Sequence, residues 1–106
     1  MPIQVKLSPR FLRDFKGMSP DISKEVMSCI SDLGKDPIPT SRRSHSVTPR
    51  GHRPIIYTDD VTSNKHWKMS YIFKNNVIWI LRTATHKELD RDPGRSVARE
   101  VLATEQ

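Results

Sequence analysis

The stretch HWKMSYIFKNNVIWILRTAT, residues 66–85, decides how this chain folds. It holds two runs rich in aromatic and β-branched residues, which favour strands, and the polar residues Lys74, Asn75 and Asn76 separate them. Asparagine tolerates the positive φ angles that a tight turn between antiparallel strands requires. The stretch therefore predicts a β-hairpin around which the rest of the chain assembles.

The same turn predicts which side chains of the hairpin share a face. If Asn75 and Asn76 form a two-residue loop, the face expected to be core carries Trp67, Met69, Tyr71, Phe73, Ile78, Ile80, Arg82 and Ala84. The opposite face, which could be solvated or hold a ligand, then carries Lys68, Ser70, Ile72, Trp79, Leu81 and Thr83. A slip of one residue would exchange the two faces of one strand.

The N-terminal third predicts a strand followed by two helices. Apolar and polar residues alternate over residues 3–7, which is the pattern of a half-buried strand. The Ser-Pro pairs at 8–9 and 19–20 each combine an N-cap with a first helical residue, and apolar residues at helical spacing follow as far as Gly17 and Gly34. Two helices joined by a short connection predict a helical hairpin packed on one face of the sheet.

The other segments complete a prediction of the fold. Residues 35–53 hold prolines and few apolar residues, so they predict a long loop or a mobile arm. Residues 54–57 resemble a short edge strand, and residues 59–64 a polar turn. We expect an α+β fold in which a small antiparallel β-sheet carries the N-terminal helical hairpin on one face, as a single domain over residues 1–91. Residues 92–106 are expected to form a C-terminal tail or a short helix that frays or docks.

The composition predicts a soluble protein of the cytoplasm. Its 106 residues suit one domain with one modest core. The single cysteine, Cys29, excludes an internal disulfide framework and lies in an apolar helical stripe. The N-terminal residues lack the apolar run of a signal peptide, and no stretch approaches the roughly 20 apolar residues of a membrane helix.

Positive charge is concentrated in the segment SRRSHSVTPRGHR, residues 41–53. Lys and Arg outnumber Asp and Glu by 18 to 12 in the whole chain, and this segment holds four arginines without an acidic residue. They are Arg42, Arg43, Arg50 and Arg53. Such a patch suits a polyanion, either nucleic acid or an acidic protein, and its alternative is a solvated loop.

Several chemistries lack the residues they need. The four histidines and one cysteine show no zinc-ligand spacing, and the four glycines are scattered singly, so no phosphate-binding loop is present. We expect no metal and no cofactor. The carboxylates Asp59, Asp60, Glu88, Asp90 and Asp92 cluster in two segments predicted as turns, where a structural role is favoured over metal-assisted cleavage.

The remaining candidate set is basic. His86 and Lys87 follow the last predicted strand, and Lys68 and Arg82 lie within the hairpin. Metal-free cleavage of RNA needs a group that deprotonates the 2′-hydroxyl, a group that protonates the leaving 5′-oxygen, and cations around the phosphorane. A histidine with nearby Lys and Arg could supply these, although a hydrogen-bonded surface histidine is the alternative. Tyr71 and the two tryptophans could stack on bases or lie in the core.

The order of elements and the hairpin sequence resemble the RelE/ParE superfamily of toxins from bacterial toxin-antitoxin pairs. The resemblance covers residues 1–91 and is carried by WKMSY, the two-asparagine turn and VIWILRTATHKELDR. Trp67-Lys68 matches the aromatic-arginine position of the family, Tyr71 its tyrosine, and His86-Lys87 the basic position after the last strand. Two departures are Lys68 in place of arginine and Leu89-Asp90-Arg91 where some RNA-cleaving members carry a tyrosine.

The resemblance implies a function and partners. It implies a toxin that cleaves messenger RNA, often at the ribosome, without a metal. His86, Lys68, Arg82 and Lys87 would be its catalytic residues, and Tyr71 with the four arginines would bind RNA. It also implies a cognate antitoxin that covers the basic groove. Two alternatives stay open: a poison of DNA gyrase, as in the ParE branch, and a basic RNA-binding module without catalytic power.

Overall fold

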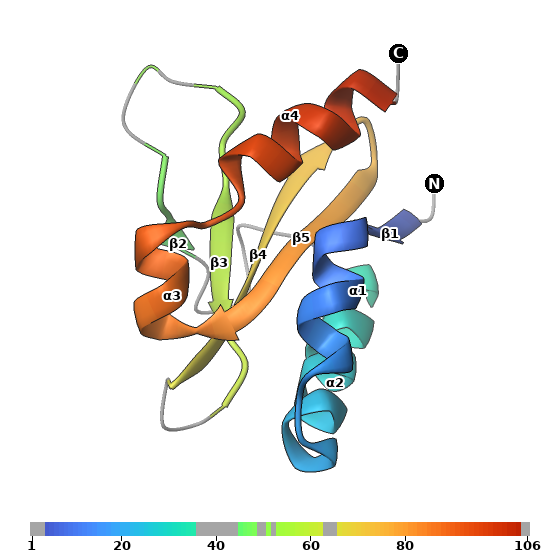
Figure 1. Cartoon of the computed structure of the whole chain (residues 1–106). Helices are drawn as coiled ribbons and strands as arrows, with labels where there is room; N and C mark the ends of the chain where they lie inside the picture. Colours follow the sequence, from blue (N-terminus) through green and yellow to red (C-terminus); the bar gives the residue numbers. More distant parts are fainter. Residues whose placement is uncertain (1–3, 36–44, 49–50, 52, 63–65, 105–106) are drawn as a thin grey trace.

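A computed structural model of the chain describes residues 4–35, 45–48, 51, 53–62 and 66–104. These residues form a mixed sheet with helices on both faces (Figure 1). In sheet order, the strands are β1 (Gln4–Leu7), β5 (Val77–Thr85), β4 (Trp67–Lys74), β3 (Tyr57–Asp60) and β2 (His45–Ser46). The helices are α1 (Pro9–Lys16), α2 (Pro20–Lys35), α3 (His86–Arg91) and α4 (Arg95–Thr104). The predicted α+β fold is confirmed, with one refinement: β1 runs parallel to β5, whereas the other neighbouring strands are antiparallel.

The central hairpin forms where the sequence predicted it. Asn75 and Asn76 have φ angles of 54° and 62°, which match the left-handed turn that joins twisted antiparallel strands. Lys74 pairs with Val77 across this turn. The two asparagines therefore set the register of the strands next to the turn.

A β-bulge changes the register farther from the turn. Tyr71 pairs with Ile80 as predicted, but Ser70 pairs with Arg82, so Leu81 is an extra residue on β5. Beyond the bulge, Arg82 shares a face with Ser70 and Lys68 instead of lying beside Met69. The predicted faces are correct near the turn and wrong for Arg82, Thr83 and Ala84. No glycine or proline marks the bulge in the sequence.

The helical hairpin is attached to β5 through the start of α1. The Ser8 side chain accepts a hydrogen bond from the Phe11 N–H at 3.0 Å, as an N-cap should, and donates another to the Leu81 carbonyl at 2.8 Å. The Ser8 N–H bonds to the Ile80 carbonyl at 3.0 Å. The cap thus fixes α1 to the central hairpin, while α2 continues one residue past Gly34, where its end was predicted.

Each face of the sheet covers its own apolar core. One core lies between the sheet and the helical hairpin and includes Phe11, Val26, Leu33, Met69, Tyr71, Ile78 and Ile80. The other lies on the opposite face, beneath α4, and comprises Ile56, Ile72, Leu81, Ala98 and Val101. The C-terminal helix therefore docks, and Figure 1 shows it lying along the sheet. None of the helices in the described ranges is long and apolar enough to cross a membrane.

Three elements differ from the prediction. Residues 45–46, which were predicted to lie in a long loop or mobile arm, form β2 and pair with β3. The strand expected over residues 54–57 instead begins at Tyr57 and continues through Asp59 and Asp60, which were predicted to lie in a turn. These aspartates tolerate a strand because the Tyr71 hydroxyl donates to Asp59 at 2.8 Å and the Lys68 ammonium lies 3.5 Å from Asp60. The short helix α3 was not predicted at all.

Candidate functional site

The candidate site lies at the open end of the hairpin, a name used here for residues 66–68 and 84–87. Trp67 pairs with Thr85 at this end, and the His86 N–H then donates to the His66 carbonyl at 2.8 Å. Thr85 ends β5 and caps α3, because its side chain accepts a hydrogen bond from the Glu88 N–H. The strand end and the helix start therefore hold His86 and Lys87 directly beside the start of β4.

His86 presents its imidazole to solvent. Its side chain is 49% exposed, and Nε2 lies 3.0 Å from the Asp90 carboxylate, one helical turn along α3. Asp90 thus orients the ring from one side. Lys87, the next residue, is also exposed. The structure therefore places two of the four predicted catalytic residues together on an accessible surface.

Lys68 lies nearby, but an ion pair restrains it. In the sheet, Lys68 pairs with Asp60 on β3 and with Ala84 on β5. The ammonium is 3.5 Å from the Asp60 carboxylate, and only 12% of the side chain is exposed. Ser70, next on the same face, has a buried hydroxyl without a hydrogen-bond partner among the described residues. Lys68 is thus a cation at the edge of the site, held by Asp60.

Arg82 does not occupy the position that was predicted for it. Its side chain is 5% exposed and lies 3.1 Å from the Asp14 carboxylate on α1. Its other nitrogens bond to the Asp92 carbonyl and pair with the carboxylates of Glu88 and Asp92. Arg82 therefore links α1, β5 and α3, so this structure does not support a catalytic role for it.

Tyr71, which was predicted to bind RNA, is likewise buried. None of its side chain is exposed, its ring stacks on Tyr57, and its hydroxyl donates to Asp59. Of the predicted RNA-binding arginines, Arg53 is exposed. Arg42, Arg43 and Arg50 lie outside the described residues.

The acidic residues bind side chains of the chain itself. Asp59 accepts from Tyr71, Asp60 pairs with Lys68, and Asp90 pairs with His86. Glu88 and Asp92 pair with Arg82. The structural role predicted for these carboxylates therefore agrees with their contacts. In the part of the chain that the structure describes, no three His, Cys, Asp or Glu side chains gather in a group that could hold a metal ion.

His66 is the residue that the sequence did not single out. It is exposed, and its ring packs edge-on to Trp67 with the centroids 5.8 Å apart. Its carbonyl accepts the His86 N–H, so the two histidines stand opposite each other at the open end of the hairpin. Only the register beyond the bulge could have revealed this, because the two residues are separated by the whole hairpin in the sequence.

Comparisons with known proteins support the fold through structure alone. No protein-family model matches the chain, and no curated protein matches it in sequence. Among solved structures, the RelBE2 toxin-antitoxin complex of Mycobacterium tuberculosis contains a chain that is similar with a TM-score of 0.64 at 17% identity. That match covers 81% of this chain and 100% of the other.

Two further structures give the same result. A free mutant of the RelE toxin of E. coli is similar with a TM-score of 0.63 at 11% identity, over 98% of both chains. The archaeal RelE-RelB complex of Pyrococcus horikoshii gives 0.62 at 16% identity, over 90% of this chain and 99% of its counterpart. Since each likeness extends over most of both chains, this chain has the RelE-like toxin fold.

Proposed function

We propose that this chain is the toxin of a type II toxin-antitoxin system and acts as a metal-independent endoribonuclease on messenger RNA at the ribosome, inhibiting translation. The observation that carries the proposal is the exposed His86, which is oriented by Asp90 and whose backbone N–H bonds to the carbonyl of the exposed His66 at the open end of the hairpin. The similar solved structures add support, because they include toxins and their complexes with antitoxins.

The proposed chemistry uses groups on this surface. One imidazole takes the proton of the 2′-hydroxyl, and the 2′-oxygen attacks the phosphorus. The bond to the 5′-oxygen then breaks, and the second imidazole supplies the proton that this oxygen needs. The products are a 2′,3′-cyclic phosphate and a 5′-hydroxyl end. His86 and His66 suit these two tasks because both are exposed and a backbone hydrogen bond holds the two residues at paired positions.

Cations around the phosphate complete the proposed site. Lys87 is exposed beside His86 and can approach the phosphorane oxygens directly, and Lys68 contributes positive charge from the edge. Arg53 is an exposed cation away from this phosphate, and together with Arg42, Arg43 and Arg50 it is proposed to grip other phosphates of the RNA. In the free toxin these arginines bind RNA phosphates, and in the complex they bind carboxylates of the antitoxin.

The test is primer extension on a defined message in a bacterial cell-free translation reaction, with purified wild-type protein and its His86→Ala variant. We expect new 5′ ends with the wild type and their loss with the variant, because a well-placed acid or base contributes roughly 10²- to 10⁴-fold. A circular dichroism melt of both proteins controls for folding. Equal cleavage by both would remove His86 from the site, and an intact message would exclude the nuclease.

Lys68 is expected to matter through its charge. Lys68→Met should lower the cleavage rate at least about tenfold, whereas Lys68→Arg should keep most of it, because arginine retains the positive charge beside Asp60. Rates would be measured on the same message, with thermal melts of each variant as a control. If Lys68→Met cleaves as fast as the wild type, the ion pair with Asp60 is structural only.

A second candidate function is supported by the burial of Arg82 and Tyr71. Two of the residues that the nuclease resemblance implied are enclosed in the protein, which leaves fewer groups for RNA chemistry. A toxin that poisons DNA gyrase needs a binding surface and cleaves nothing itself. Halted DNA synthesis in cells whose messages stay intact would select this candidate, and blocked translation with normal DNA synthesis would exclude it.

A further inference from the structure

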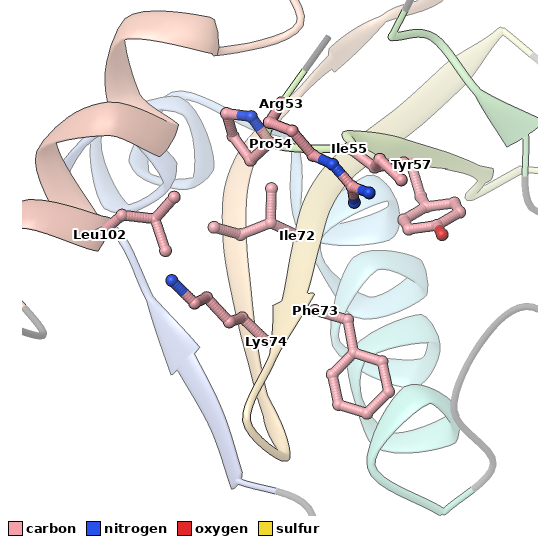
Figure 2. A pocket seen from close by; sticks show the side chains of 8 residues that line it. All are labelled: Arg53, Pro54, Ile55, Tyr57, Ile72, Phe73, Lys74 and Leu102. Carbon is pink, nitrogen blue, oxygen red and sulfur yellow. The ribbon is translucent and has the colours of Figure 1, made fainter. Parts of the chain in front are cut away.

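An apolar pocket of about 790 Å³ lies at the other end of the hairpin, near the Asn75-Asn76 turn. Ile72, which is almost fully buried, forms its floor, and half-buried apolar side chains surround it. Two cations, Arg53 and Lys74, stand at the rim (Figure 2). The apolar lining consists of Pro54, Ile55, Tyr57, Ile72, Phe73 and Leu102.

The pocket exists because β4 extends beyond its neighbour. The ladder between β3 and β4 begins at the pair Tyr57–Tyr71, so residues 72–74 of β4 continue past it. The chain just before β3 is held on the other side, where Ile56 bonds to Val47 and Thr48. The end of α4 borders this gap through Leu102 (Figure 2). The sheet thus leaves a hollow between three separate segments.

The charge around the pocket limits what can occupy it. An apolar lining favours an apolar side chain, and the two rim cations favour carboxylates beside that side chain. A second copy of this chain would bring the same two cations to the same place, on a protein whose net charge is +6. Charge complementarity therefore favours an acidic partner over self-association.

The pocket is also distant from the candidate catalytic residues. His66 and Phe73 are seven residues apart on one extended strand, which corresponds to roughly 23 Å. A segment that fills the pocket therefore does not touch His66 or His86. Binding at the pocket and blocking of the open end of the hairpin would be separate events along one partner chain.

We infer that the pocket anchors an acidic amphipathic segment of a protein partner, with an apolar side chain of that segment against Ile72 and Leu102 and flanking carboxylates against Arg53 and Lys74. The inference rests on the proposed toxin function, for which the partner is the antitoxin. It goes beyond that function by assigning the anchoring site and by separating it from the catalytic end.

The test uses the product of the open reading frame that directly neighbours this chain's gene. It would be titrated by calorimetry against the wild type and against the double variant Lys74→Glu, Leu102→Asp. We expect at least about tenfold weaker binding by the double variant, because it loses an apolar contact and reverses a rim charge. RNA cleavage by the double variant should equal that of the wild type.

A matched control carries the same change of charge elsewhere. Lys24 and Met27 are both exposed on α2, Met27 to 48%, so Lys24→Glu, Met27→Asp should bind within about twofold of the wild type. Melting curves of both double variants establish that they fold. Equal binding by the pocket variant and the control would overturn the pocket assignment and leave the toxin function standing. If the wild type does not bind the neighbouring gene product, that product is not the partner, and the inference that the pocket anchors it is overturned as well.

Discussion

Replacement of Arg82 with alanine is expected to lower the free energy of unfolding by about 3–5 kcal/mol, because it leaves a largely buried carboxylate without its partner. Asp14 is 12% exposed, and Arg82 approaches both of its oxygens, at 3.1 and 3.3 Å. The Thr83 N–H also donates to Asp14. Without the guanidinium, the negative charge of Asp14 would remain between α1 and β5 with weaker compensation from Arg10.

Urea unfolding of Arg82→Ala, Asp14→Ala and the double variant would measure this pair. The double variant should be more stable than the sum of the single changes predicts, because it removes both charges at once. Arg82→Lys should be intermediate, since an ammonium keeps the charge but cannot bond to both carboxylate oxygens as the guanidinium does. A loss below about 1 kcal/mol in Arg82→Ala would show that the ion pair contributes little, as surface pairs do.

This stability effect determines how activity data on Arg82 should be understood. If Arg82→Ala abolishes RNA cleavage, the loss follows from unfolding or from movement of α1 and α3, unless the melting curve is unchanged. His86→Ala is the cleaner probe, because His86 is half exposed and, among the described residues, its side chain pairs only with the exposed Asp90. Arg82 and His86 look like equivalent basic candidates in the sequence, but the structure gives Arg82 a buried ion pair and leaves His86 half exposed.

The parts of the fold that follow local rules could be predicted from the sequence. Asn75 and Asn76 tolerate the positive φ of the turn, and Ser8 caps α1 with a hydroxyl that the helix start needs. Each of these signals acts within a few residues. The strands and helices beside them were therefore found, and the α+β fold followed from their order.

The errors arose where distant residues decide the structure. Asp14 and Arg82 are separated by 68 positions, so nothing near Arg82 in the sequence shows that its charge is already neutralised. Asp59 and Asp60 looked like turn residues because their partners, Tyr71 and Lys68, lie on the next strand. The same limit applied to the candidate site. His86 was identified from its residue type and its position after the last strand. The pairing of His66 with His86 depends on the register beyond the β-bulge, which only the structure shows.

The largest effect on activity is expected from the histidine pair. His86→Ala and His66→Ala should each slow single-turnover cleavage of RNA about 10²-fold or more, because each removes one of two proton transfers. The double variant should be only slightly slower than the slower single variant, since an acid and a base that act in one step are not additive. The backbone bond between the two residues does not depend on either side chain, so the open end of the hairpin should stay intact in all three proteins.

Rates on one defined message, together with melting curves, would measure this cycle. If His66→Ala cleaves within about threefold of the wild type while His86→Ala is inactive, His66 takes no part, and the second proton transfer must involve another group such as Lys87. If the two effects multiply fully in the double variant, the histidines act on separate steps. Non-additive losses at full stability are the result that the pairing of His66 and His86 across the hairpin predicts.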